Sequence, residues 1–144
     1  MVSTELSPAV EDRTYPLISD RDIREESPAI DDWSIVRHER VNALVIGSHA
    51  AANAVLSRVF PEVRWAHALW SPADGPGRHH SHIALVHDPQ DLTDAQQEQL
   101  LAWMERHPAI QVISLAARSL YPMVVAGSFR APLYYRLNTF TFAL

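Results

Sequence analysis

Residues 41–60, VNALVIGSHAAANAVLSRVF, decide the fold class. The first seven of these residues are mostly apolar and end at Gly47, which predicts a buried strand followed by a turn. Residues 51–60 carry apolar side chains at helical spacing, and Pro61 ends this predicted helix. A strand, a glycine turn and a helix in this order are the usual setting of a phosphate-binding loop. An ordinary strand-to-helix turn is the alternative.

The same alternation continues along the chain. Further strands are predicted at residues 64–70, 83–86, 109–116 and 139–144. Further helices are predicted at residues 28–38, 93–106, 120–126 and 133–137, with Thr93 as the N-cap of the second. Strands that alternate with helices predict an α/β fold of three layers, with a mostly parallel sheet flanked by helices.

The composition excludes several kinds of chemistry. The 144 residues include no cysteine and no lysine. The 12 basic residues are all arginine, and with 17 acidic residues they give a net charge of -5. Without cysteine the chain forms no disulfide, thiolate zinc site or iron–sulfur cluster. Without lysine it offers neither Schiff-base chemistry nor the lysine of a working phosphate loop.

We expect two regions that differ in composition. Residues 1–26 are polar, acidic and interrupted by proline, so they predict a flexible N-terminal arm, and residues 27–144 predict one domain. The sequence begins without the pattern of a signal peptide, and no apolar run approaches the ~18 residues of a membrane span. We therefore expect a cytoplasmic protein.

Two clusters of polar residues have alternative interpretations. His79, His80, His82 and His87 are spaced so that they could bind zinc or nickel, but a solvated histidine-rich loop is the simpler interpretation and we predict no metal site. Residues 106–144 hold four arginines and no acid. Because this segment is also rich in aromatic and aliphatic residues, we expect core packing there and no direct DNA binding.

A family resemblance emerges near the C-terminus. Residues 127–140, GSFRAPLYYRLNTF, resemble the run GRFREDLYYRLNVF of sigma-54-dependent activators, the bacterial enhancer-binding proteins of the AAA+ ATPase class. Three upstream runs resemble the same family in the same order. Residues 112–120 are similar to its run VIAATNRDL, and residues 44–58 are similar to LITGESGTGKELVAR. Residues 85–92, continued by Gln97, Leu100 and Leu101, are similar to FLDEIGDL…Q…LL. Residues 27–30 resemble its SPAM run, so the resemblance covers about residues 27–144.

The resemblance implies a vestigial nucleotide site. Its phosphate loop would consist of Gly47, Ser48, His49, Ala50, Ala51, Ala52, Asn53 and Ala54. Asn53 stands at the family's Walker A lysine, and alanines replace loop glycines. His87 matches the Walker B aspartate and Asp88 the catalytic glutamate, while Ala117 matches the sensor asparagine.

The arginines of the family pattern are kept. Arg130 and Arg136 match arginines that reach a neighbouring subunit's nucleotide, so the resemblance makes them candidates for arginine fingers. The GAFTGA loop that grips the sigma factor is absent, and the sequence includes neither the helical lid nor a helix-turn-helix. The resemblance thus implies a shortened, degenerate AAA+ core.

The resemblance leads to one expected function and two alternatives. We expect a protein without ATPase activity that acts in bacterial transcription regulation by associating with an intact AAA+ activator. One alternative is a module that binds ATP and magnesium weakly through the vestigial loop. The other is an interaction or structural protein that reuses the fold, with strand 139–144 open to pairing with another chain, including a second copy of itself.

Overall fold

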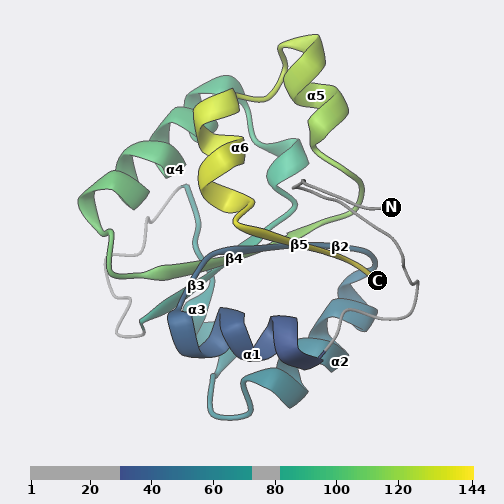
Figure 1. The fold of residues 1–144 in the computed structure, drawn as a ribbon. Coiled ribbons are helices and arrows are strands. Elements are labelled where there is room, and N and C mark those ends of the chain that lie inside the picture. The colour runs from purple at the N-terminus through teal and green to yellow at the C-terminus, as the bar shows by residue number, and fades with distance from the viewer. Residues whose placement is uncertain (1–29, 73–81) are drawn as a thin grey trace, which may run out of the picture.

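The computed structural model describes residues 30–72 and 82–144. Four parallel strands form its sheet, in the order β3-β4-β2-β5 (Figure 1). They are β2 (Ala43–Ile46), β3 (Ile83–His87), β4 (Gln111–Ala116) and β5 (Phe140–Ala143). This arrangement confirms the predicted parallel sheet. The predicted arm at residues 1–26 lies outside the described residues.

One face of the sheet is covered by the helices that come early in the chain. They are α1 (Ile30–Glu39), α2 (His49–Val59) and the short α3 (Trp65–Ala68). Trp33 of α1 stacks on Phe142 of β5 with ring centroids 3.9 Å apart, and Leu56 of α2 is fully buried beside them. Burial of such large side chains supplies most of the free energy that holds this layer to the sheet.

The later helices cover the other face, so the molecule has three layers (Figure 1). They are α4 (Asp94–Arg106), α5 (Tyr121–Ala126) and α6 (Ala131–Leu137). Leu100, Trp103 and Leu133 from these helices pack against the strands in a second core. Thr93 caps α4 as predicted: its hydroxyl accepts from the Gln96 backbone N–H, and the Gln96 side chain accepts from the Thr93 N–H.

The strand predicted at residues 64–70 is wrong. Trp65 to Ala68 form α3, and only Leu69 makes an isolated bridge to Leu85 of β3. Trp65 and Ala68 are three residues apart and both pack into the first core, so a helical turn buries them together. The spacing of the apolar side chains in residues 64–70 is therefore compatible with both a strand and a helix.

Two details complete the fold. A 3₁₀ turn, η1 (Pro89–Asp91), which the sequence did not predict as helical, links β3 to α4. Gly127 ends α5 with a φ of 84°, a left-handed conformation in which glycine has no steric penalty. No helix in the described ranges is long and apolar enough to cross a membrane.

Candidate functional site

The predicted phosphate loop is mostly helical. α2 begins at His49, so only Gly47 and Ser48 separate it from β2. Ser48 is the N-cap, and its Oγ accepts a hydrogen bond of 3.1 Å from the Ala51 N–H. The helix thus starts two residues before the predicted position. Alanine is the strongest helix former, and residues 48–54 contain no glycine, which explains why the segment winds into α2.

The turn at Gly47 is filled by the end of β5. The Leu144 N–H donates to the Ile46 carbonyl at 2.8 Å, which brings Leu144 across the turn. A Cβ atom at position 47 would lie only 3.1 Å from the Leu144 Cβ. The glycine therefore has a packing reason in this chain, in addition to any role in the approach of a phosphate.

The structure brings two predicted site segments together at the carboxyl edge of the sheet. His49 of α2 donates through Nε2 to Oδ1 of Asp88, which follows β3, at 3.1 Å. The Gln90 side chain donates to the same oxygen at 3.2 Å. Asp88 adopts a left-handed φ of 53°, and its N–H donates to the Leu115 carbonyl. The carboxylate therefore points across the edge toward α2, and His49 as its partner was not foreseen from the sequence.

His87, at the matched Walker B position, lies beside this pair. Its ring centroid is 4.7 Å from that of His49. Partial burial is the largest cause that lowers the pKa of His87, and the neighbouring His49 lowers it further, while Asp88 opposes both. A neutral imidazole is thereby favoured at a position where the family pattern has an aspartate.

These residues do not fit a magnesium nucleotide. Asn53, at the lysine position, is an exposed residue in the second turn of α2, and Asp88 is already bonded to His49. Within residues 30–72 and 82–144, no group of three or more histidine, aspartate and glutamate side chains is placed to hold a metal ion. His79 and His80 lie outside the described residues. The first-turn N–H groups of His49 and Ala50, which have no acceptor inside α2, are the remaining phosphate donors.

The two candidate arginines lie at opposite ends of α6 and each contacts α4. Arg130 donates to both carboxylate oxygens of Asp94, at 2.9 and 2.8 Å, and lies 3.8 Å from Glu98. The hydrogen bonds to Asp94 are the main reason that the pKa of Arg130 is raised. Arg136 lies 3.8 Å from Glu105. Both arginines therefore pair with acids of their own chain, an arrangement that the sequence spacing did not reveal.

Gln97 has a structural part in the same region. It is only 1% exposed, and its amide donates to the carbonyls of Leu92 and Ser128 at 3.2 and 3.1 Å. Its Oε1 accepts from the Arg130 backbone N–H at 2.8 Å. One buried side chain thus ties the start of α4 to the segment that leads into α6, and sequence reasoning noted this glutamine only as part of the family pattern.

Comparison with known proteins adds solved structures of similar fold. No protein-family model matches the sequence. No curated protein matches it either. NtrX from Brucella abortus in complex with ATP is similar with a TM-score of 0.59 and 17% identity, over 78% of this chain and 33% of that one. The P-loop NTPase domain of the sigma-54 transport activator from E. coli is similar with a TM-score of 0.56 and 16% identity, over 79% of this chain and 95% of that one.

At this level of identity the likeness concerns the fold. The ADP complex of the same NtrX gives a TM-score of 0.60 at 17% identity, over 78% of this chain and 34% of that one. The chain therefore spans about a third of the NtrX chains and nearly all of the E. coli domain. Its parallel four-stranded sheet, flanked by helices on both faces, has the fold of the P-loop NTPase core of sigma-54 activators.

Proposed function

We propose that this chain is a non-hydrolysing relative of sigma-54 activator ATPase cores that acts in bacterial transcription regulation by binding an intact activator. The observation that carries the proposal is the start of α2 at His49, together with the hydrogen bond of His49 to Asp88. At the edge that holds a nucleotide in a working P-loop protein, α2 of this chain begins after only two intervening residues, and its first side chain bonds to Asp88.

Hydrolysis of ATP needs groups that this edge lacks. A lysine and a metal ion stabilise the negative charge that develops on the transferred phosphoryl group, and a carboxylate or amide orients the attacking water. The chain has no lysine, and His87 and Ala117 stand at the metal and sensor positions that the family pattern implies. We therefore expect no ATPase activity.

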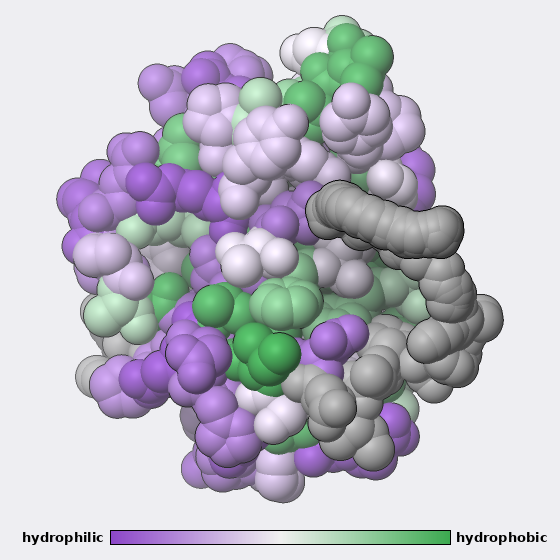
Figure 2. Space-filling model, viewed as in Figure 1, coloured by the Kyte–Doolittle hydropathy of each residue, from purple (hydrophilic) through white to green (hydrophobic). Residues whose placement is uncertain are grey.

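An exposed surface on α5 and α6 supports a role in protein association. Val125 is 71% exposed and Tyr135 is 65% exposed, and Tyr121 is also on the surface. Figure 2 shows the hydrophobic area over α5 at the top of the molecule. None of the α5 residues is buried, although the helix is mostly apolar. An apolar helix that contributes so little to its own core is typical of a contact surface for another protein.

The arginines refine this proposal. Arg130 would have to give up two hydrogen bonds to Asp94 before it reached a neighbouring subunit. The Arg136 guanidinium is held less firmly, since its ion pair within the described part of the chain is a 3.8 Å contact with Glu105. Arg136 is therefore the better candidate to contact a neighbour's nucleotide, and we propose that Arg130 mainly holds α6 on α4.

A reconstituted assay tests the proposal. The full chain is added to a purified AAA+ activator, and binding and the activator's ATPase rate are measured. We expect binding and a changed rate, both lost in Val125→Arg. The matched control is Ile35→Arg, because Ile35 is also an exposed apolar residue, 43% exposed, but lies on α1 across the sheet. No binding to any activator tested, or equal loss in both variants, would contradict the proposal.

A weak ATP-binding module is the second candidate. The first-turn N–H groups of His49 and Ala50, which have no acceptor inside α2, favour it, since the start of a helix attracts anions. The carboxylate of Asp88 beside them opposes it through charge repulsion. Micromolar binding of magnesium ATP, mapped to these residues, would support this candidate over the first.

A further inference from the structure

β5 is an edge strand with one open side. In the sheet order β3-β4-β2-β5, it pairs with β2 alone among the described strands. Phe140 and Leu144 donate through their N–H groups to carbonyls in or beside β2, at 3.3 and 2.8 Å, so the even-numbered residues face β2. Because backbone groups alternate in direction along a strand, the N–H and C=O groups of Thr141 and Ala143 point away from the sheet. Among the described residues, these four groups have no hydrogen-bond partner.

The open side of β5 lacks the features that usually prevent strand pairing. Residues 137–144, LNTFTFAL, include neither a proline nor a charged residue. Thr141 and Ala143 are exposed, and both have small side chains. An extended segment with two backbone positions facing the sheet can therefore be added to this edge, because main-chain hydrogen bonds supply the affinity in such pairing.

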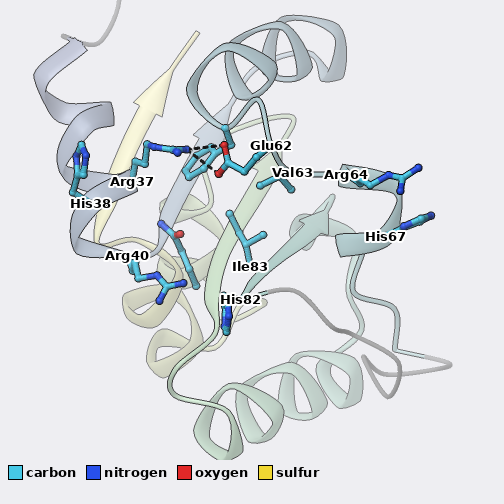
Figure 3. A pocket seen from close by; sticks show the side chains of 11 residues that line it. Arg37, His38, Arg40, Glu62, Val63, Arg64, His67, His82 and Ile83 are labelled. Carbon is cyan, nitrogen blue, oxygen red and sulfur yellow. Dashed lines mark hydrogen bonds and ion pairs between the residues drawn. The ribbon is translucent and has the colours of Figure 1, made fainter.

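The start of α1 is held beside β5. Trp33, in the first turn of α1, stacks on Phe142 with ring centroids 3.9 Å apart. The other end of α1 is fixed as well, because the Gln111 amide donates to two backbone carbonyls in and just after α1, at 2.8 and 2.7 Å. Arg37 donates to both carboxylate oxygens of Glu62, and Figure 3 shows this pair at the wall of a cavity lined by the end of α1. The chain that leads into α1 therefore arrives next to the open edge.

The sequence ahead of α1 includes a segment that suits this edge. Residues 14–19, TYPLIS, are the longest uncharged run in residues 1–29, and they lie outside the described residues. Pro16 has no N–H, so in a strand it is tolerated where the backbone faces solvent. In an extended conformation with Pro16 on the solvent side, the backbone groups of Tyr15 and Leu17 face the opposite way. They are two residues apart, which is also the spacing of the outward-facing residues of β5.

The length of the connection favours this segment over a strand from another chain. Ten residues, 20–29, separate it from α1, and they can span up to about 36 Å. The four residues of β5 extend over only about 13 Å, so the segment reaches the edge in either strand direction. A short tether gives an effective concentration on the order of millimolar. At micromolar protein, the chain's own segment therefore outcompetes an equally favourable strand of a second copy.

We propose that residues 14–19 pair with the outer side of β5 as a fifth strand of the sheet. Tyr15 and Leu17 exchange backbone hydrogen bonds with the outward-facing residues of β5. Pro16 then faces solvent, where it prevents a further strand from pairing. Residues 14–19 thereby form a strap that protects a neutral edge from other chains, including second copies. The strap does not depend on the proposed binding of an activator.

Amide hydrogen exchange of the full chain, followed by NMR, tests the pairing. We expect the amides of Thr141 and Ala143 to exchange slowly, and equally so at low and high protein concentration. Leu17→Pro removes an N–H that faces β5, so it should speed their exchange about tenfold or more, as expected when a strap that is docked most of the time is lost. Ile18→Pro is the matched control, because it removes an N–H that faces solvent. Fast exchange of both amides in the unaltered chain, or an equal effect of both variants, would overturn the proposal.

A spin label locates the strap and identifies the chain that supplies it. The sequence has no cysteine, so Ser19→Cys creates a single labelling site. We expect the label to broaden the amide signals of Thr141 and Ala143 and to leave those of β3, at the opposite edge of the sheet, unchanged. When the spin-labelled chain is mixed with isotope-labelled chain that carries no spin label, the signals of the latter should stay sharp. Broadening that passes between chains, together with a doubled mass, would show that a second copy covers the edge and would overturn the proposal, as would broadening that spares β5.

Discussion

The imidazole of His49 donates to the carboxylate of Asp88 across 3.1 Å, which joins the first turn of α2 to the end of β3. These two segments flank the place where a nucleotide binds in a working P-loop protein. In this chain they contact each other directly. The contact and the early start of α2 together leave no loop between β2 and α2 that could surround a phosphate group.

Restoring the missing lysine alone should not restore nucleotide binding. Asn53 is the fifth residue of α2, so the side chain in Asn53→Lys would extend from a formed helix and not into a loop. We expect no gain in affinity for magnesium ATP, measured by calorimetry. We also expect a small gain in stability, a few tenths of a kcal/mol, since lysine favours helix more than asparagine does. Micromolar binding by this variant would show that a usable loop persists.

His87 should make the stability depend on pH near neutrality. Its pKa is lowered in the folded chain, so the unfolded chain binds more protons once the pH falls below the usual imidazole value of about 6.5. The free energy of unfolding therefore decreases as the pH falls from about 7 toward the lowered pKa of His87. We expect a smaller decrease in His87→Asn, measured by urea denaturation at several pH values.

The pH range keeps the test specific to His87. The pKa of Glu62 is also lowered, chiefly by its hydrogen bond from Arg37, but that group loses its contribution only at acid pH, below the usual carboxyl range. Measurements above about pH 5 therefore largely exclude it. An equal or larger decrease in His87→Asn would contradict the assignment.

Gln97 should be important for folding. In Gln97→Leu the backbone N–H of Arg130 and the carbonyls of Leu92 and Ser128 lose their partner in a partly buried region. We expect a loss of about 2 to 4 kcal/mol in the free energy of unfolding. The control is Gln99→Ala, an exposed glutamine that donates to the Pro72 carbonyl, which should change stability by less than about 0.5 kcal/mol. A similar effect of both changes would refute the role of the buried amide.

Arg40→Gly should stabilise the fold. Arg40 directly follows α1 and has a φ of 56°. This left-handed conformation costs a residue with a side chain about 1–2 kcal/mol, and the greater freedom of glycine in the unfolded chain offsets part of the gain. We expect a net increase of about 0.5 to 1 kcal/mol in the free energy of unfolding, measured by denaturant titration. A decrease would mean that the Arg40 side chain makes a stabilising contact in the folded chain.

Much of the architecture could be predicted because its signals are local. The apolar runs of β3 and β4 mark buried parallel strands, and Thr93 with Gln96 marks the start of α4. Residues 64–70 were predicted wrongly because their apolar side chains suit either period, and packing against the first core selects the helix.

The site was harder to predict because it depends on contacts between distant segments. The family resemblance indicated Asp88 and the 47–54 segment, yet the partner of Asp88 is His49, 39 residues away. The ion pairs of Arg130 with Asp94 and of Arg136 with Glu105 likewise form only when α6 packs on α4.

Titration of the full chain with magnesium ATP tests the central claim most directly. Calorimetry gives the affinity, and phosphate release under the same conditions gives the hydrolysis rate. The account predicts no phosphate release and no binding in the micromolar range, because α2 and the His49–Asp88 contact occupy the edge of the sheet. Micromolar binding with chemical shift changes at residues 47–53, or measurable hydrolysis, would contradict it.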